Sequence, residues 1–271
     1  MNNKQGVSVR QRLSGKIDYR ASLTYKGKHI ALGSYDSKIA AHNAYEYGKK
    51  ILKSKSVRLK NIPEAPPLYY EKCVSLINMR DNGLYIANPI YLKKKFFLYC
   101  LSPSVHYRFD IEDLFYFSSH KIMKRGGHLF VSDYGSQLNV LSRFGIKPHS
   151  VQGRDYDFYN GDPTDLRYEN IKIINRYNGV HQVEERGFIR FKSVINMHSN
   201  YIVGIYDTEK EAAVAYNKAA KTLIENGVIK KFKLNFIENI SEAEYMEIYK
   251  NIYISPKITH FVPKNMSNNK K

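Results

Sequence analysis

Two stretches of the chain, LGSYDSKIAAHNAYEYGKKIL at residues 32–52 and VGIYDTEKEAAVAYNKAAKTL at residues 203–223, are copies of one another. Aligned without a gap at an offset of 171 residues, they share eight identical positions, including a Gly-x-Tyr-Asp sequence and a later Ala-Tyr pair. Self-similarity at a fixed offset indicates a structural unit that occurs twice. We therefore expect the two copies to adopt the same local fold.

Each repeated stretch is expected to continue a small sheet into a helix. In copy one, strands are predicted over residues 7–12, 19–25 and 29–35, with a tight turn at Lys26-Gly27. Apolar residues alternate with polar ones along the last two strands, so one face is apolar and the other polar. Small residues recur at helical spacing after residue 37, which suits a helix packed closely on the apolar face. Asp36 or Ser37 can cap this helix, and Thr208 with Glu211 forms a capping box in copy two.

The net charge of +18 is concentrated at the N-terminus. Residues 1–60 carry +11, residues 179–236 carry +3, residues 255–271 carry +4, and the remainder is neutral. Such a distribution favours a polyanionic partner, nucleic acid above all, over a solvated basic surface without a partner. The two cysteines are too few for a disulfide scaffold or a zinc finger. No apolar run is long enough to span a membrane and no secretion signal is recognisable, so we expect a cytoplasmic, nucleoid-associated protein without membrane contact.

The region between the copies begins with a proline-rich linker at residues 60–68. A helix is expected over residues 70–79, and strands over residues 84–87, 96–101 and 171–174. After copy two, Ser241 and Glu244 indicate the start of a further helix. The end of the chain, residues 255–271, is expected to be a weakly ordered basic tail.

The three strands and the helix resemble the ethylene-response-factor (AP-two) DNA-binding domain of plants. Copy one carries the resemblance at Gly6-Val7, Arg10 to Arg12, Tyr19-x-Ala21-x-Leu23, Leu32-Gly33, Tyr35-Asp36 and the Ala41-Ala44-Tyr45 helix. Copy two carries it at Gly179-Val180, Phe191-x-Ser193-x-Ile195, Gly204, Tyr206-Asp207-Thr208 and the helix that contains Ala212, Ala215 and Tyr216. The resemblance implies that the sheet lies in the major groove, that arginines on its exposed face read bases, and that the helix braces the sheet from behind.

The face of the first sheet that the helix leaves open is the predicted reading surface. Arginine can hold guanine through two hydrogen bonds, serine and threonine can contact bases or phosphates, and lysines near turns suit phosphates. The candidate residues of copy one are Arg10, Arg12, Lys16, Arg20, Ser22, Thr24, Lys26, Lys28 and His29. In copy two Val183 and Glu185 stand in place of the first two arginines, and the candidates are Arg190, Lys192 and Asn196. This second surface could either contact DNA or serve as a packing surface, and the sequence leaves both alternatives open.

Residues 105–178 resemble His-Asn-His homing endonucleases, a family in which the nuclease unit often adjoins this kind of DNA-binding domain. The resemblance is carried by residues 110–113, Ser118-x-His120-Lys121, residues 127–131, Leu141-Ser142-Arg143 and residues 157–171. The last segment contains the pattern Asn-Gly-Asp-x-x-Asp-x-Arg-x-Glu-Asn. The resemblance implies a ββα-type fold in which a histidine acts as the general base.

Three positions depart from the pattern of active family members. Ser142 and Phe158 stand where those members have histidine, and Leu166 stands where they have asparagine. Phenylalanine cannot accept a proton, so the base that would activate water is missing. Asp157 and Asn170 are the residual metal candidates, and two such ligands make at best a weak Mg²⁺ site. A substitute base at His149 is a minor alternative, and we expect no catalytic residue, no bound metal and no cofactor.

The expected fold class is α+β, with two modules of a three-stranded antiparallel sheet plus a helix flanking a degenerate, ββα-type His-Asn-His nuclease-like domain. The predicted boundaries are residues 1–62 for the first module, 63–178 for the linker and nuclease-like domain, 179–236 for the second module, and 237–271 for a helix and basic tail. The predicted function is sequence-specific binding of double-stranded DNA by a transcriptional regulator derived from a homing endonuclease, in a prokaryote, its phage or a mobile element. The alternatives are an active endonuclease with an altered metal site and a non-specific nucleoid or RNA binder. The oligomeric state and any protein partner are open.

Overall fold

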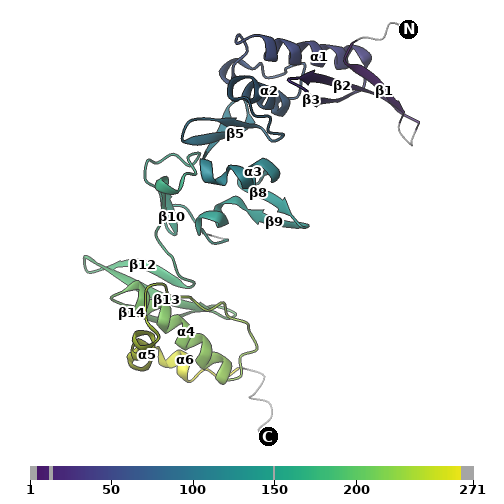
Figure 1. Ribbon diagram of the computed structural model, residues 1–271. Coiled ribbons are helices and arrows are strands. Elements are labelled where there is room, and N and C mark those ends of the chain that lie inside the picture. Colours follow the sequence, from purple (N-terminus) through teal and green to yellow (C-terminus); the bar gives the residue numbers. More distant parts are fainter. Residues whose placement is uncertain (1–4, 12–14, 149, 264–271) are drawn as a thin grey trace. The chain divides into compact units, whose positions relative to one another are not determined.

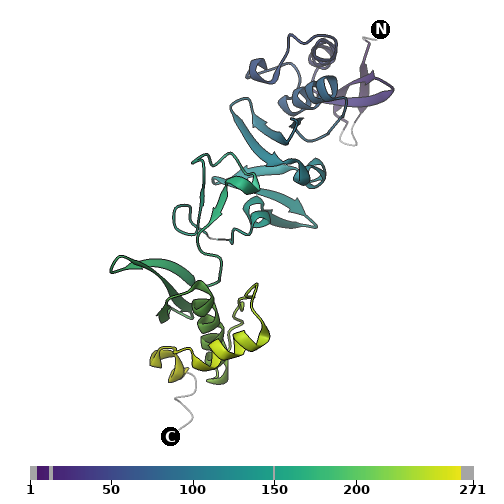
Figure 2. The same cartoon turned by 60° about the vertical axis from the view of Figure 1, so that its left-hand side comes forward.

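The computed structural model describes residues 5–11, 15–148 and 150–263, and the chain forms two compact units (Figures 1 and 2). Unit 1 comprises Met1–Phe144 and Phe158–Ile171, and unit 2 comprises Gly145–Asp157 and Lys172–Lys271. Helices and small three-stranded antiparallel sheets occur in both, which confirms the predicted α+β class. Among the described residues, no helix combines the length and the apolar character that crossing a membrane requires.

The first repeated module opens unit 1. Strands β1 (Val7–Gln11), β2 (Ile17–Tyr25) and β3 (Lys28–Tyr35) form an antiparallel sheet in that order, and helix α1 (Lys38–Lys53) covers one face (Figure 1). Lys26 and Gly27 have φ of 46° and 76°, the left-handed pair typical of a two-residue hairpin turn. The side chain of Ser37 accepts a hydrogen bond from the backbone N–H of Ala40, so Ser37 is the helix cap.

The apolar face of this sheet is buried, as the alternation predicts. The side chains that fill it are Ala21, Leu23, Ile30 and Leu32 from the sheet, and Ala41, Ala44, Tyr45, Gly48, Ile51 and Leu52 from α1. A methyl group added at Gly48 would lie 3.1 Å from Leu23 Cδ2, so the absence of a side chain there lets the helix approach the sheet closely.

The rest of unit 1 continues the same core and adds two further sheets. Helix α2 (Tyr70–Asn82) packs against α1, and its residues join the core of the first module. One sheet consists of β4 (Ile90–Leu92), β5 (Phe96–Ser102) and β6 (Val105–Asp110), and the other of β7 (Ile122–Arg125), β8 (His128–Asp133) and β9 (Ser136–Asn139). Helix α3 (Leu114–Ser119) lies between them in the sequence, and short 3-10 turns form at η1 (Leu59–Asn61), η2 (Ile111–Asp113), η3 (Val140–Phe144) and η4 (Tyr168–Asn170).

The strand expected over residues 84–87 is not present, and that prediction was wrong. These residues form an irregular segment after α2. Side chains of α2 satisfy its carbonyl groups in place of a neighbouring strand: Asn78 Nδ2 donates to Leu84 O at 2.8 Å, and Ser75 Oγ donates to Ala87 O at 3.3 Å. A run of four apolar residues is too short to distinguish a strand from an irregular segment that is bonded to the side chains of a helix.

Two short strands, β10 (Tyr156–Phe158) and β11 (Ile171–Ile173), pair where the chain passes from one unit to the other. Unit 2 then repeats the first module, with β12 (Val180–Glu185), β13 (Phe188–Asn196) and β14 (Asn200–Tyr206) forming the sheet and α4 (Glu209–Glu225) packed against it (Figure 1). The predicted capping box of Thr208 and Glu211 is present at the start of α4. Helix α5 (Glu242–Asn251), capped by Ser241, and helix α6 (Pro256–Thr259) both pack against α4.

The first residues of the segment 255–271, which was expected to be a weakly ordered tail, are ordered. Residues 256–259 form α6, and the side chain of Ile258 is completely buried in the core of unit 2. The expectation of a weakly ordered segment was wrong there because one apolar residue docks the short helix onto α4. Residues 264–271 lie outside the described part of the chain.

Both modules contain the same contact between a glycine and a tyrosine. Gly6 (φ 78°) lies beneath the ring of Tyr45, and Gly179 (φ 69°) lies beneath the ring of Tyr216. The carbonyl group of each glycine accepts a hydrogen bond from the central strand, at 2.9 Å from Ser22 N and 2.7 Å from Val194 N. Only glycine adopts this backbone conformation readily, and only glycine leaves room for the ring. This contact explains why glycine and tyrosine recur in both copies.

Candidate nucleic-acid interface

The face of the first sheet opposite α1 is exposed and polar. Strand register sets its neighbours: Arg20 on β2 lies between Ser8 on β1 and Ser34 on β3. The next pairs along the sheet are Ser22 with Ala31 and Thr24 with His29. Of these residues only Ser22 is partly buried. The structure thus brings the predicted residues of β2 and β3 together on one surface.

Arg20 occupies the centre of this face. It is exposed, it lies on the middle strand, and both of its cross-strand neighbours are serines with short side chains. A long side chain between short ones projects furthest from the sheet. The guanidinium group of Arg20 is therefore accessible to a partner that approaches this face.

Arg10 lies directly across from Asp18, an acidic residue that the sequence analysis did not single out. Asp18 points to the same face as Arg20, yet only 3% of its surface is exposed. A carboxylate directly across from an arginine on the neighbouring strand offsets part of the positive charge of this face. The sequence could have indicated this, because Asp18 and Arg20 are two residues apart on β2 and so point to the same face of the sheet. Arg12 lies outside the described residues.

The predicted lysines all lie at or next to turns of this module. Lys16 Nζ is 3.0 Å from Asp36 Oδ1, and both side chains are exposed. Lys26 extends over the ring of Tyr25, and Lys28 lies 4.7 Å from the ring centre of Tyr85 in the segment after α2. Exposed contacts of this kind are weak, so these lysines can leave them for a phosphate group at little cost.

Two of the three predicted residues of the second module, Arg190 and Asn196, already bind partners within unit 2. Arg190 Nε lies 3.0 Å from Asp207 Oδ1 and donates to the carbonyl group of Tyr206. Asn196 donates to Asn200 Oδ1 at 2.9 Å and accepts a hydrogen bond from Lys230. Lys192 occupies the position that Arg20 has in the first module, beside His181 and Ile205.

The open face of the second sheet is also more apolar than that of the first. Phe188 is 72% exposed, Ile202 is 50% exposed, and Ile205 is exposed too. Polar readout of bases requires hydrogen-bonding groups that aliphatic side chains lack. The two faces therefore differ in chemistry although their backbones match.

The loop of residues 160–170 in unit 1 is held by its own polar residues. The buried side chain of Asn170 accepts from Asn160 N at 2.9 Å and donates to Asp165 O at 2.8 Å. Asp162 accepts from Thr164 and lies 3.0 Å from Arg108 Nη1. These bonds give the Asn-Gly-Asp sequence at residues 160–162 a structural role within the loop.

The three positions at which the sequence departs from the resembled nuclease pattern, Ser142, Phe158 and Leu166, hold no side chain that can act as a base. Phe158 and Leu166 are buried, with at most 7% of either residue exposed, and Ser142 is exposed in η3. Asp157 accepts a hydrogen bond from Gln152 Nε2 at 3.2 Å. Over the described residues, no group of three or more histidine, cysteine or acidic side chains is arranged to hold a metal ion. His149 is outside the described residues.

A ββα unit requires a helix after its second strand. Residues 174–179, all of which are described, form bends and a turn that lead directly into β12. The segment between β11 and β12, which is described throughout, therefore contains no helix of the kind that a ββα arrangement would place there.

The chain matches no family model, no curated protein and no solved structure. The likeness to His-Asn-His nucleases and to the AP-two domain stays a prediction from the sequence.

Lys147 of unit 2 lies near residues of the second repeated module, and its surroundings shift its pKa. Burial lowers the pKa of Lys147 to about 8, against attraction from Glu209 and Asp155. Below pH 8 the folded state holds a charged, partly buried ammonium group. Above pH 8 it releases the proton while the unfolded lysine still binds it, so stability rises with pH towards the unfolded pKa of about 10.4.

We expect Lys147→Met to stabilise the chain at pH 7, by less than about 1 kcal/mol because the group is partly exposed and solvent screens its charge. The difference between variant and wild type should shrink as the pH rises from 8 to 10. Chemical denaturation at several pH values measures both quantities. A variant that is less stable at pH 7 would show that the attraction to Glu209 and Asp155 outweighs burial.

Proposed function

We propose that the chain binds double-stranded DNA sequence-specifically, with the open face of β1–β3 in the major groove, and regulates transcription. The observation that carries the proposal is the exposed face on which Arg20 projects between two serines. An arginine in that position suits two hydrogen bonds to guanine O6 and N7. Thr24 and His29, one step along the sheet, add shorter polar groups for neighbouring bases.

The charge around the face supports the same function. Residues 1–60 carry +11, and the lysines next to the strands, Lys16, Lys26 and Lys28, lie at the ends of β2 and β3 and not at the centre of the sheet. Contacts to phosphate fix the position of a protein on the duplex, while contacts to base edges determine sequence. A central arginine surrounded by peripheral lysines matches this division of roles.

The second module is proposed to contribute little base reading. Its candidates Arg190 and Asn196 have partners within unit 2, and its open face is partly aliphatic. A tethered second module still raises the effective concentration of any DNA it touches. Its loss should therefore reduce affinity more than it changes the preferred sequence.

Binding is proposed to occur without cleavage. The support is the burial of Phe158 and Leu166 at positions where the resembled nucleases need polar groups, together with the use of Asn170 in holding its own loop. Target DNA incubated with the protein and Mg²⁺ or Mn²⁺ should remain intact. Specific nicks that disappear in Asp157→Ala would instead establish the endonuclease alternative.

Arg20→Ala is expected to weaken binding to a preferred duplex by about ten-fold to a hundred-fold, since a bidentate contact contributes roughly 1–3 kcal/mol of discrimination. Arg20→Lys should retain affinity for random DNA and lose preference, because lysine keeps the charge without the planar pair of donors. Fluorescence anisotropy with preferred and scrambled duplexes measures both effects.

The control is Lys94→Ala, which removes one exposed positive charge from the turn between β4 and β5. It should change affinity for both duplexes slightly and equally. If Arg20→Ala behaves like this control, the face does not read bases.

A further inference from the structure

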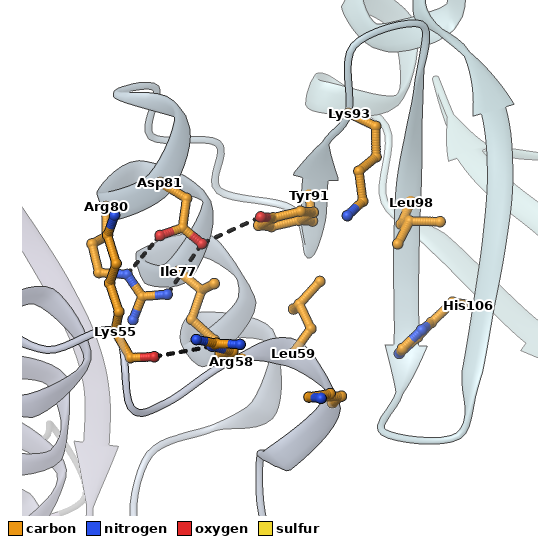
Figure 3. A pocket seen from close by; sticks show the side chains of 11 residues that line it. Lys55, Arg58, Leu59, Ile77, Arg80, Asp81, Tyr91, Lys93, Leu98 and His106 are labelled. Atoms are coloured by element: carbon orange, nitrogen blue, oxygen red, sulfur yellow. Dashed lines mark hydrogen bonds and ion pairs between the residues drawn. The ribbon is translucent and has the colours of Figure 1, made fainter.

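Unit 1 contains a cavity of about 630 Å³ that is separate from the open face of β1–β3 (Figure 3). Its lining comes from the segment after α1, from α2 and from β4 to β6, and includes no residue of the first sheet. Small-molecule sites typically occupy roughly 300–1,000 Å³. The cavity is therefore large enough for an organic ligand.

Arg80 lines one side of the cavity, and its guanidinium group is engaged by hydrogen bonds within the protein. Its Nη1 lies 2.9, 2.7 and 2.8 Å from the carbonyl oxygens of Ile51, Ser54 and Val57. Its Nε and Nη2 donate to the carboxylate of Asp81, and the arginine side chain is only 6% exposed. Arg80 thus ties the end of α1 to α2, and the charge of Asp81 is neutralised.

Four further cations surround the cavity. Hydrogen bonds from Arg80 lower the pKa of the Asp81 carboxyl in the same lining, and the charge of Lys55, one of the four, contributes to this lowering. Lys55, Arg58, Lys60 and Lys93 are exposed, and none forms an ion pair with another described residue. Figure 3 shows Lys55 and Arg58 on one side and Lys93 on the other. Like charges gathered around a concave site raise the local concentration of anions. They would repel one another less with an anion between them.

The interior of the cavity is apolar in contrast to this rim. Leu59, Ile77 and Leu98 line it, beside the ring of Tyr91. His106 adds no charge near neutral pH, because burial lowers its pKa and its Nε2 already contacts the hydroxyl group of Tyr70 at 3.1 Å. A ligand that fits this site has an apolar ring for the floor and several negative charges for the rim.

We propose that this cavity binds a nucleoside di- or triphosphate, with its ring on the apolar floor and its phosphoryl groups among the four cations. A DNA duplex fits less well, because its phosphates lie on a convex surface and its paired bases are stacked inside the helix, away from a concave site. The proposal does not depend on DNA reading by the first sheet, since the two surfaces share no residue.

The test is a titration of the full chain with a fluorescent ATP analogue near physiological salt. Wild type should show saturable binding with one site per chain. Lys60→Gln/Lys93→Gln should weaken that binding by about ten-fold or more, as two charge-assisted contacts are lost. The matched control is Arg10→Gln/Arg20→Gln, which removes the same charge from the open face of the sheet and should leave nucleotide binding unchanged.

Two outcomes would overturn the proposed role of the cations in nucleotide binding. Equal weakening by both double variants would mean that the analogue follows net charge and not the cavity. Weakened duplex binding by Lys60→Gln/Lys93→Gln, with nucleotide binding intact, would reassign the cations to DNA.

The floor is tested separately by displacing the bound analogue with ATP or with inorganic triphosphate. ATP should displace it at concentrations several-fold lower, because only ATP carries a ring for Leu59, Ile77 and Leu98. Equal displacement would overturn the nucleoside part of the proposal.

Discussion

Asp165→Ala is expected to lower the free energy of unfolding by about 3 kcal/mol or more, because it removes the buried partner of two arginines. The side chain of Asp165 is completely buried. Its oxygens accept from Arg167 Nε at 2.8 Å, Arg167 Nη2 at 2.7 Å and Asn160 Nδ2 at 3.1 Å, and Arg108 Nη1 lies 3.6 Å away. The whole loop from Asn160 to Asn170 is organised around this carboxylate.

The loss should also depend on pH. Burial acts to raise the pKa of Asp165, but hydrogen bonds from Arg167 outweigh burial and hold the pKa below its ordinary value. The folded state therefore favours the carboxylate, and this stabilisation is present above the unfolded pKa of about 3.9. It disappears as the pH falls through the folded value, so wild type and Asp165→Ala should converge in strong acid.

Glu169→Ala is the matched control for this prediction. Glu169 pairs with the same Arg167, but its side chain is 70% exposed. An exposed ion pair contributes roughly 0–1 kcal/mol, so this variant should unfold almost like wild type. Denaturant titrations of the full chain compare the two variants. Equal effects would show that Asp165 does not organise the loop.

Gly179→Ala is the second large effect, with an expected loss of about 3 kcal/mol from steric overlap and backbone strain together. A methyl group there would lie 2.2 Å from the carbonyl oxygen of Val194 and 2.5 Å from Tyr216 Cε2. Moving Gly179 to relieve the overlap would break its hydrogen bond from Val194 N. Gly6→Ala should act in the same way on the first module, where the ring of Tyr45 is in contact.

Gly187→Ala separates the two contributions to that loss. Gly187 has a similar φ of 81°, but a methyl group there would meet nothing within 4 Å. It should lose roughly 1–2 kcal/mol from the left-handed conformation alone. If thermal unfolding of Gly179→Ala matches that of Gly187→Ala, the glycine–tyrosine contact is not a determinant of the module.

The modules were predictable because their signals are local. A two-residue turn, the Ser37 and Thr208 caps and alternating apolar strands each depend on neighbours in the sequence, and the structure contains all of them. The repeat itself gave the two sheet-plus-helix units. The strand expected at residues 84–87 failed because its carbonyl groups bond to α2 side chains, a tertiary contact that a short apolar run does not encode.

The site was predictable in part for the same reason. Alternation correctly placed Arg20, Thr24 and His29 on the exposed face. It did not give the burial of Asp18, nor the internal partners of Arg190 and Asn196. The basic cavity was missed because its cations come from segments that are distant in the sequence, although the lysines at residues 93–95 were a visible signal.

The central claim is that the first sheet reads DNA sequence. Selection of bound sequences from a random duplex pool tests it most directly, with wild type, Arg10→Ala/Arg20→Ala and the charge-matched control Lys94→Ala/Lys95→Ala side by side. Wild type and the control should enrich one common motif, and the sheet variant should enrich none. Enrichment of the same motif by the sheet variant would contradict the claim.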